Sequence, residues 1–288
     1  MKRKAASRAM TALAAASIAQ VAIPGTAAAQ CRVPASSNEA RLLAYYAAPL
    51  AFAALGAPRP LRPGGIVLAM EATYIPAPPD ALRQTSICFR PKEENTHLSP
   101  VLPRPRVVVG LPWGAQLEAS WLPPITLMDA TPNLYGVALS ATWKVGPSAN
   151  AAVRAHLTGG SVRGPVTCDR EALQLEDPMA ACYGSSPSRD RYSPNVRGVQ
   201  FLLGRELGAR VRVAAAAGWS ALEPRFQVWF RDATGFLDST RVVTSLSRWN
   251  GGLLAEYSPR LRTTITAAVF AVPEDVTLLR LGFSFTGR

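Results

Sequence analysis

Apolar and polar residues alternate with a period of two in many segments of the chain from Gly65 onward. Around residues 115–121, for example, apolar side chains occupy the odd positions and polar ones the even positions. This alternation is typical of β-strands with one apolar face, and no convincing helical period is present in this part of the chain. We predict ten strands, at residues 65–75, 105–111, 115–122, 134–144, 150–159, 196–206, 210–230, 241–257, 261–272 and 276–286.

Connections between the predicted strands alternate between short turns and longer loops. The short set is predicted near residues 112–114, 146–148, 207–209 and 258–260, and most of the other connections are longer: 76–104, 123–133, 160–195 and 231–240, with 273–275 as a short exception. Opposed residues in antiparallel strands point to the same face, so apolar residues should meet apolar partners. This predicts the pairs Val109–Leu117, Trp121–Tyr135 and Trp143–Ala151.

The predicted hairpin around Gly235 is unusual because its apolar residues change phase along both strands. They occupy odd positions up to Trp219 and even positions from Phe226 onward. A register that opposes Trp219 to Leu253 and Phe230 to Val242 satisfies both halves. It requires opposed bulges or a bend near residues 223–224 and 250–252.

Many hairpins, short turns opposite long loops, and aromatic residues toward strand ends together favour a closed membrane barrel over a soluble β-sandwich. A closed barrel also satisfies every backbone hydrogen bond without leaving an edge in lipid. A soluble exported β-barrel that binds a small apolar ligand is the alternative. The aromatic residues near strand ends are Tyr74, Trp121, Tyr135, Trp143, Tyr257 and Phe285.

The last strand, 279–285, ends in alternating aromatic residues and resembles the C-terminal signal that the barrel-assembly machinery reads. With it, the chain from about residue 65 to 288 resembles bacterial outer-membrane β-barrel proteins. The resemblance implies an all-β, closed, antiparallel up-and-down transmembrane β-barrel of about ten strands over residues 64–288. It also implies the outer membrane of a Gram-negative-type bacterium as location. The expected partners are outer-membrane lipid, lipopolysaccharide phosphates and the barrel-assembly machinery.

Residues 1–29 have the pattern of a cleaved signal peptide. Four cationic residues within the first eight precede an apolar stretch at 10–23, and Ala27–Ala29 supplies the small residues before a cleavage site. Residues 30–63 are predicted to form a periplasmic or plug segment, because 42–56 is apolar and uncharged with Pro49 in its middle. We expect both ends of the mature chain to be periplasmic.

Four cysteines in an exported chain favour disulfides over metal or redox chemistry. Cys168 and Cys182 lie in one polar stretch and are predicted to pair. Cys31 and Cys88 remain as a second candidate pair. With a periplasmic amino terminus and an extracellular first loop, these two can bond only if the segment threads through the lumen.

If the apolar faces contact lipid, the alternate residues line the lumen. Six cations then face three carboxylates, which predicts either a packed network of ion pairs or a basic constriction that favours anions. His156 could serve as a general base beside Ser120 or Ser140, although a lone lumen histidine is more often an ordinary polar residue. The predicted lumen-lining residues are Glu71, Glu118, Lys144, Arg154, His156, Arg210, Arg212, Glu256, Arg262 and Arg280.

The chain is basic, with 31 Lys and Arg against 19 Asp and Glu and a formal net charge of +12 over 288 residues. The cations are spread along strands and loops without a basic helix, so nucleic acid is not an expected partner. No nucleotide-binding or metal-binding motif is found, and we expect no cofactor and no metal. The favoured function is non-enzymatic: a small, anion-preferring channel, a ligand-binding barrel or a structural envelope component. An outer-membrane hydrolase acting on lipid or peptide is the rival.

Overall fold

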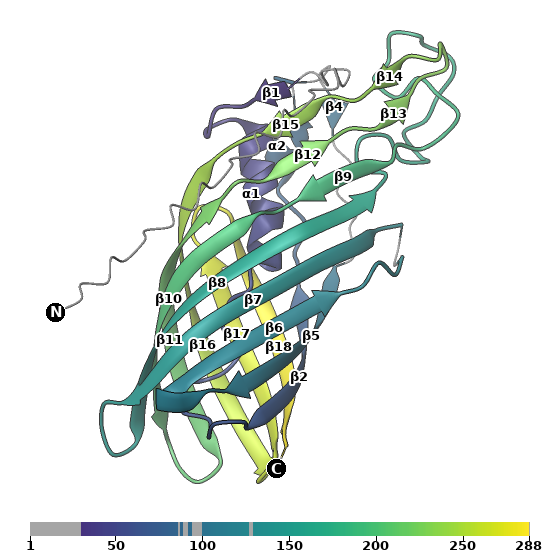
Figure 1. Ribbon diagram of the computed structural model, residues 1–288. Coiled ribbons are helices and arrows are strands. Elements are labelled where there is room, and N and C mark those ends of the chain that lie inside the picture. Colours follow the sequence, from purple (N-terminus) through teal and green to yellow (C-terminus); the bar gives the residue numbers. More distant parts are fainter. Residues whose placement is uncertain (1–29, 86, 89–91, 94–99, 127–128, 288) are drawn as a thin grey trace, which may run out of the picture.

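The structure is a computed structural model that describes residues 30–287 except 86, 89–91, 94–99 and 127–128. The predicted signal peptide lies outside the described residues. Ten antiparallel strands follow one another around a ring, and the last pairs with the first to close a barrel (Figure 1). They are β2 (Ile66–Tyr74), β5 (Val101–Gly110), β6 (Ala115–Leu122), β7 (Thr131–Lys144), β8 (Ala149–Gly164), β10 (Val196–Glu206), β11 (Val211–Leu222), β16 (Leu246–Arg260), β17 (Thr263–Val272) and β18 (Val276–Thr286).

The predicted all-β, closed, up-and-down barrel of ten strands is therefore confirmed. Three predicted registers are also confirmed, since Val109 pairs with Leu117, Trp121 with Tyr135, and Trp143 with Ala151. Several strand ends differ from the prediction: β7 begins at Thr131, β8 continues to Gly164, and the predicted strands 210–230 and 241–257 are each divided, with β11 ending at Leu222 and β16 beginning at Leu246. β5 begins at Val101 rather than 105, and β16 continues through a register irregularity to Arg260, so its turn follows at residues 261–262.

The predicted register of the Gly235 hairpin is wrong by four residues. Trp219 pairs with Trp249 rather than with Leu253, and Phe230 pairs with Asp238. The turn decides the register, because the Asp232 carboxylate accepts hydrogen bonds from the backbone N–H groups of Thr234 and Phe236, both at 2.9 Å. This side chain centres the turn two residues earlier than predicted. Moving the centre of a turn by two residues moves the paired partner of every strand residue by four.

The loop end of the barrel carries a second set of short elements (Figure 1). Four short strands extend the sheet beyond β8 in the order β9, β12, β15, β1, with β1 and β15 parallel. Two further hairpins stand apart from that sheet. The bounds are β1 (Gln30–Arg32), β9 (Asp190–Ser193), β12 (Arg225–Gln227) and β15 (Arg241–Val243), with hairpins β3 (Gln84–Thr85) and β4 (Lys92–Glu93), and β13 (Phe230–Arg231) and β14 (Leu237–Asp238).

Three helical elements complete the fold: α1 (Asn38–Leu50), α2 (Asp80–Arg83) and the 3-10 turn η1 (Pro112–Gly114). The Oγ of Ser37 accepts a hydrogen bond from the backbone N–H of Ala40 and caps α1, and Pro49 lies in the last turn. α1 occupies the mouth of the barrel at the loop end (Figure 1). No helix among the described residues is long and apolar enough to cross a membrane.

Both disulfide pairings are present. Cys168 and Cys182 are bonded, which confirms the predicted pair, and Cys31 is bonded to Cys88. The second bond corrects the expected position of the amino-terminal end, because Gln30 lies at the loop end beside Arg241 of β15, whereas the carboxyl end lies at the short-turn end. Residues 33–63, called the plug below, therefore run through the lumen from the loop end to the start of β2.

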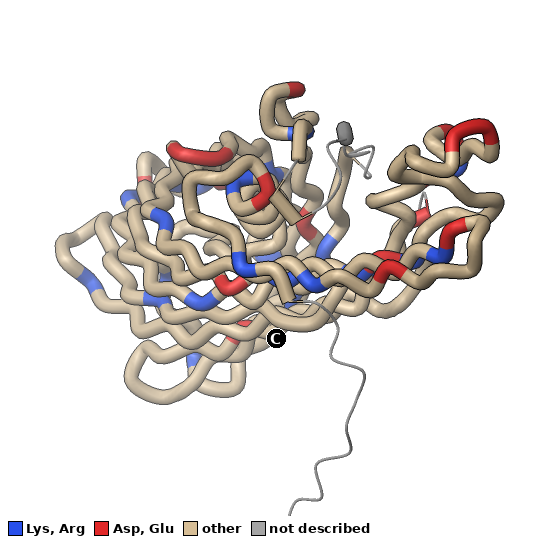
Figure 2. The backbone as a smooth tube through the Cα atoms, turned by 90° about the horizontal axis from the view of Figure 1, so that it is seen from above, with Lys and Arg blue, Asp and Glu red and all other residues tan. Residues whose placement is uncertain are grey.

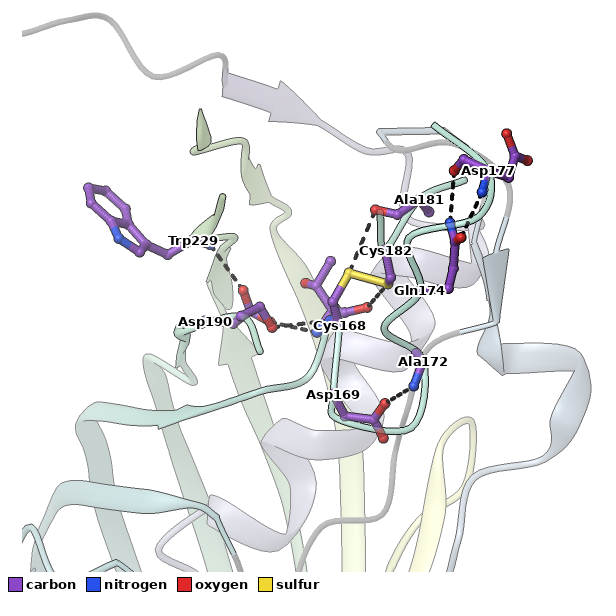
Figure 3. The surroundings of a disulfide bond; sticks show 11 residues. Cys168, Asp169, Ala172, Gln174, Asp177, Ala181, Cys182, Asp190 and Trp229 are labelled. Carbon is purple, nitrogen blue, oxygen red and sulfur yellow. Dashed lines mark hydrogen bonds between the residues drawn. A yellow bond between two sulfur atoms is a disulfide. The ribbon is translucent and has the colours of Figure 1, made fainter. Parts of the chain in front are cut away.

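Figure 3 shows how the cysteine loop is held near the Cys168–Cys182 bond. The buried carboxylate of Asp190 accepts hydrogen bonds from the backbone N–H of Thr167, from the Ser188 hydroxyl at 2.7 Å and from the backbone N–H of Trp229 at 3.0 Å. It thereby joins the cysteine loop to the segment between β12 and β13. The cysteine loop and the hairpin of β13 and β14 together form a protruding lobe. Seen from above, acidic residues gather at the tips of this lobe, while many of the cations lie along the barrel (Figure 2).

Candidate functional site

The side of the wall that a strand residue faces follows its position along the strand. In β7, for example, odd residues such as Tyr135 and Leu139 point outward and are about half exposed, whereas Leu134 and Ala138 are buried inside. Alternate residues point outward in the other strands as well, so large apolar side chains cover the outside. The exposed residues on the other strands include Leu68, Met70, Leu117, Trp121, Val153, Phe201, Leu253, Ile265, Leu281 and Phe283.

The extended part of the plug, residues 51–62, is bonded to the barrel through its backbone. The N–H of Phe52 donates to Thr158 Oγ1 at 3.0 Å, the N–H of Ala54 to Gln200 Oε1 at 3.1 Å, and the N–H of Ala57 to Glu256 Oε1 at 2.9 Å. These acceptors come from three different strands. Because a buried backbone group without a partner is costly, the wall side chains replace the partners that a helix or sheet would supply.

Arginines of the wall bind the carbonyl groups of the same segment. Arg104 donates to the carbonyls of Leu50 and Ala51 at 2.9 and 3.2 Å, and Arg106 donates to that of Ala53 at 3.0 Å. Arg154 of β8 donates to the carbonyl of Phe52. The three guanidinium groups also surround the Phe52 ring, with their central carbons 4.4–5.7 Å from its centroid.

Two carboxylates neutralise part of this arginine cluster. Glu118 bridges Arg106 and Arg154, each at 2.7 Å, and Glu71 is paired with Arg106. Arg280 lies 3.4 Å from Glu71 and stacks over the Phe270 ring at 4.6 Å. Buried charges of this kind are stable only when they are paired and hydrogen-bonded, as most are here.

Inward-facing glycines give the plug room to pass. A Cβ at Gly136 would lie 2.7 Å from the Phe52 ring, and one at Gly204 would lie 2.7 Å from Pro58. Any larger residue at these positions would collide with the plug, so the wall and the segment inside it are fitted to one another.

The structure places the predicted lumen residues in two groups. Six point inward and join the ion-paired network: Glu71, Glu118, Arg154, Arg212, Glu256 and Arg280. His156 is also buried inside the barrel, and neither ring nitrogen has a hydrogen-bond partner among the described residues. The other three lie exposed near the short-turn end, at or just beyond the ends of their strands: Lys144, Arg210 and Arg262.

Sequence reasoning missed Arg104 and Arg106, which hold the plug. The segment 101–106 contains two prolines and was assigned in part to a loop, although Arg104, Arg106 and Val108 keep the inward, even-numbered phase of the strand. Arg106 already stands at an inward position of the predicted strand 105–111, and extending the alternation backward through those prolines would have found Arg104 as well. Phe52 carried no such signal.

An apolar cavity of about 160 Å³ lies at the loop end, between the plug and one side of the wall. Leu43, Pro49 and Leu50 line it from the plug, and Leu102, Leu122 and Val162 line it from β5, β6 and β8. Two polar groups at its border are already bonded: Glu39 accepts from the backbone N–H of Ile87 at 2.7 Å, and the Tyr192 hydroxyl donates to the carbonyl of Leu43 at 2.7 Å. Burial raises the pKa of Tyr192 well above its ordinary value, so this donor stays neutral.

A second cavity, of about 120 Å³, lies around residues 54–61 in the short-turn half. Its wall is polar and includes Gln116, Ser140, Thr142 and Thr266. In the described part of the chain, no group of three or more His, Cys, Asp or Glu side chains is placed to hold a metal ion.

Comparisons with known proteins give structural matches alone. No family model matches the chain, and no curated protein matches it. The solved structures include Ail, the attachment invasion locus protein of Yersinia pestis, at 9% identity and TM-score 0.32, covering 78% of this chain and 100% of that one. The toluene transporter TbuX of Ralstonia pickettii matches at 9% identity and TM-score 0.32, covering 79% and 90%. The KdgM porin matches at 10% identity and TM-score 0.30, covering 78% and 99%.

Proposed function

We propose that this protein is an outer-membrane β-barrel whose lumen is closed by its own plug and which binds a small apolar ligand in the loop-end cavity. The apolar outer surface supports the membrane location, since large exposed apolar residues repeat around the whole wall. Closure of the strand ring removes the unpaired edges that lipid would penalise. A freely soluble barrel would expose the same surface to water.

The position of the aromatic residues agrees with this location. Trp121 and Tyr135 form one outward pair toward the loop end, and Trp143 lies outward toward the short-turn end. Such residues prefer the two membrane interfaces because their rings are apolar and their polar atoms reach water. We propose that the loop end is extracellular and the short-turn end periplasmic. Contacts with lipopolysaccharide and delivery by the barrel-assembly machinery belong to the same proposal.

Ligand binding is the favoured one of the three non-enzymatic functions. An open anion-preferring channel would need free cations around a water-filled path, but Arg104, Arg106 and Arg154 are bound to plug carbonyls and carboxylates. The rival hydrolase would need a serine bonded to His156, and that ring has no hydrogen-bond partner in the described residues.

The apolar cavity is the observation that carries the proposal. Its volume of about 160 Å³ is close to that of the engineered, dry cavity of about 150 Å³ that takes up benzene in another protein. Its lining is almost entirely apolar, and it favours an uncharged apolar molecule of about the size of a single ring.

The direct test is binding of fluorobenzene to the purified, disulfide-intact protein, followed by ¹⁹F NMR. We expect saturable binding that is lost in Val162→Phe, where the larger side chain enters the cavity. Val153→Phe, an outward position on the same strand, is the matched control and should bind normally. Equal binding by both variants, or none by the native protein, would overturn the proposed ligand site.

The closed lumen has its own test in planar bilayers. The native protein should show no steady open-channel conductance, because residues 51–62 are bonded to wall strands on several sides. Gly136→Leu should produce conductance or frequent openings, since its side chain displaces Phe52. A large, constant conductance of the native protein would contradict the plugged barrel.

A further inference from the structure

The wall of the barrel is incomplete between β5 and β6. These strands pair over four positions, Val107–Gly110 with Gln116–Ala119, within a stretch, 100–126, that is described without a gap. On its other edge β5 pairs with β2 from Val101 to Val109, and β6 pairs with β7 along its whole length. The missing pairs leave a seam toward the loop end.

Prolines explain where the pairing stops. The backbone N–H of Leu111 donates to the carbonyl of Ala115, so the odd residues of β5 direct their backbone groups toward β6. Continuing the register, Pro105 would stand opposite Trp121 and Pro103 opposite Pro123. Neither β5 proline has an N–H to donate, and the pairing ends at Val107, the last residue facing β6 before them.

The apolar cavity lies directly behind this seam. Leu102 and Leu122, on its two sides, line the cavity, and so does Pro103, whose side chain points outward and is exposed. The cavity is therefore lined both by the plug and by residues on either side of the seam, one of which faces outward.

An unpaired strand edge is costly in a membrane barrel because lipid offers no hydrogen-bond partner. Proline lowers that cost on β5, since it removes the donors that would remain unpaired. The seam lies between the apolar outer surface and the apolar cavity, whereas the lumen route passes the arginine cluster.

We propose that the seam between β5 and β6 is the path by which an uncharged apolar molecule passes between the surrounding lipid and the loop-end cavity. This inference rests on the proposed ligand site and adds the route to it. The prolines at 103 and 105 keep the path open by preventing the two strands from pairing.

The test is the double substitution Pro103→Val and Pro105→Val, which restores two N–H groups facing β6. Hydrogen exchange at the Trp121 amide, which faces β5 as the odd residues of β6 do, reports whether the seam has closed. ¹⁹F NMR exchange reports the rate at which fluorobenzene enters protein embedded in lipid vesicles. We expect slower amide exchange and ligand entry slowed about 30-fold, the effect of two added hydrogen bonds. The equilibrium affinity should change less than about twofold, since valine keeps an apolar side chain of similar size at position 103, which lines the cavity.

The matched control is Pro259→Val, which makes the same change in β16 at the short-turn end. It should leave entry unchanged. Protection of the β6 amides with unchanged entry would show that the ligand uses another route, and no gain in protection would show that the prolines do not hold the seam open; either result overturns the inference. Absence of fluorobenzene binding in the native protein would instead overturn the proposed function.

Discussion

The two halves of the barrel interior are filled in different ways. At the loop end, α1 packs apolar faces against the wall: Ala44, Ala47 and Ala51 contact Val196, Leu222 and Leu246. In the short-turn half the plug is an extended strand held by arginines, glutamates and polar side chains. One half resembles the core of a soluble protein, and the other a polar lumen occupied by backbone.

This difference explains the change of apolar phase in β11 and β16. Leu222, Phe226 and Val228 are all buried at even positions, and in β16 Leu246, Leu254 and Glu256 are buried at even positions as well. The strands keep one inward face throughout, so the predicted bulges near 223–224 and 250–252 are wrong. The inward face is polar in the short-turn half and apolar at the loop end, because the interior changes along the barrel. The outward face is apolar where it contacts lipid.

The largest loss of stability is expected for Arg106→Met, in the polar half of the interior. It leaves Glu71 and Glu118 buried without their shared cation and removes the bond to the Ala53 carbonyl. We expect a loss of about 3–5 kcal/mol, the usual result of removing one partner of a buried pair. Urea unfolding in lipid vesicles, followed by tryptophan fluorescence, measures it.

Arg197→Met is the control for that substitution. Arg197 pairs with Glu223 at 2.8 Å, but both side chains are largely exposed. Its loss should cost about 0–1 kcal/mol. Equal costs for the two variants would show that the interior network is as solvated as the surface.

The difference between the outside and the inside of the wall is tested by Leu139→Arg. Leu139 points outward and is half exposed, so we expect the arginine to cost about 2–4 kcal/mol in a bilayer. Ser140→Arg points toward the polar cavity and should be tolerated better. Heat-modifiable migration in detergent gels and membrane fractionation show how much of each variant assembles. Normal assembly of Leu139→Arg would contradict a lipid-facing surface.

Loss of the Cys168–Cys182 disulfide at the loop end should lower the stability of the protein less than loss of an interior arginine. Cys182→Ser removes a cross-link that closes a short loop, worth at most about 3 kcal/mol in the chain-entropy model. We expect the loop 165–189 to become sensitive to protease while the barrel keeps its heat-modifiable migration. Loss of the barrel itself would show that the lobe and the wall fold as one unit.

The smallest effect is expected at Asp232, in the exposed hairpin turn. Its hydrogen bond from the Thr234 hydroxyl, with backbone N–H groups adding to it, holds the pKa of this carboxylate below its usual range. Stabilisation of the turn is therefore complete above the ordinary carboxyl pKa and is lost as the pH falls through the lowered one. The protection factor of the Phe236 amide, which corrects for the intrinsic effect of pH on exchange, should fall in that acidic range and in Asp232→Ala above it, while protection in β7 stays unchanged. A turn unaffected by either change would remove the explanation given for its register.

Strand positions were predictable because the outward face has one simple requirement, contact with lipid, that every strand repeats. The pairs Val109–Leu117 and Trp143–Ala151 follow from it. The interior was less predictable, since its partner is the plug, and nothing in the period of residues 42–56 indicates which wall residues would bind it. Arg104, Gln200 and Thr158 hold the plug through backbone groups, and a backbone group has no sequence signature.

The plug is covalently linked at both of its ends to segments that flank β2. At one end it continues directly into β2, and at the other the Cys31–Cys88 bond ties it to the segment that follows β2. While that bond is oxidised, the segment cannot be expelled from the lumen in either direction. Any widening of the interior must then come from bending and shifting of the chain inside the lumen. Reduction of the Cys31–Cys88 bond would remove the covalent link at its outer end.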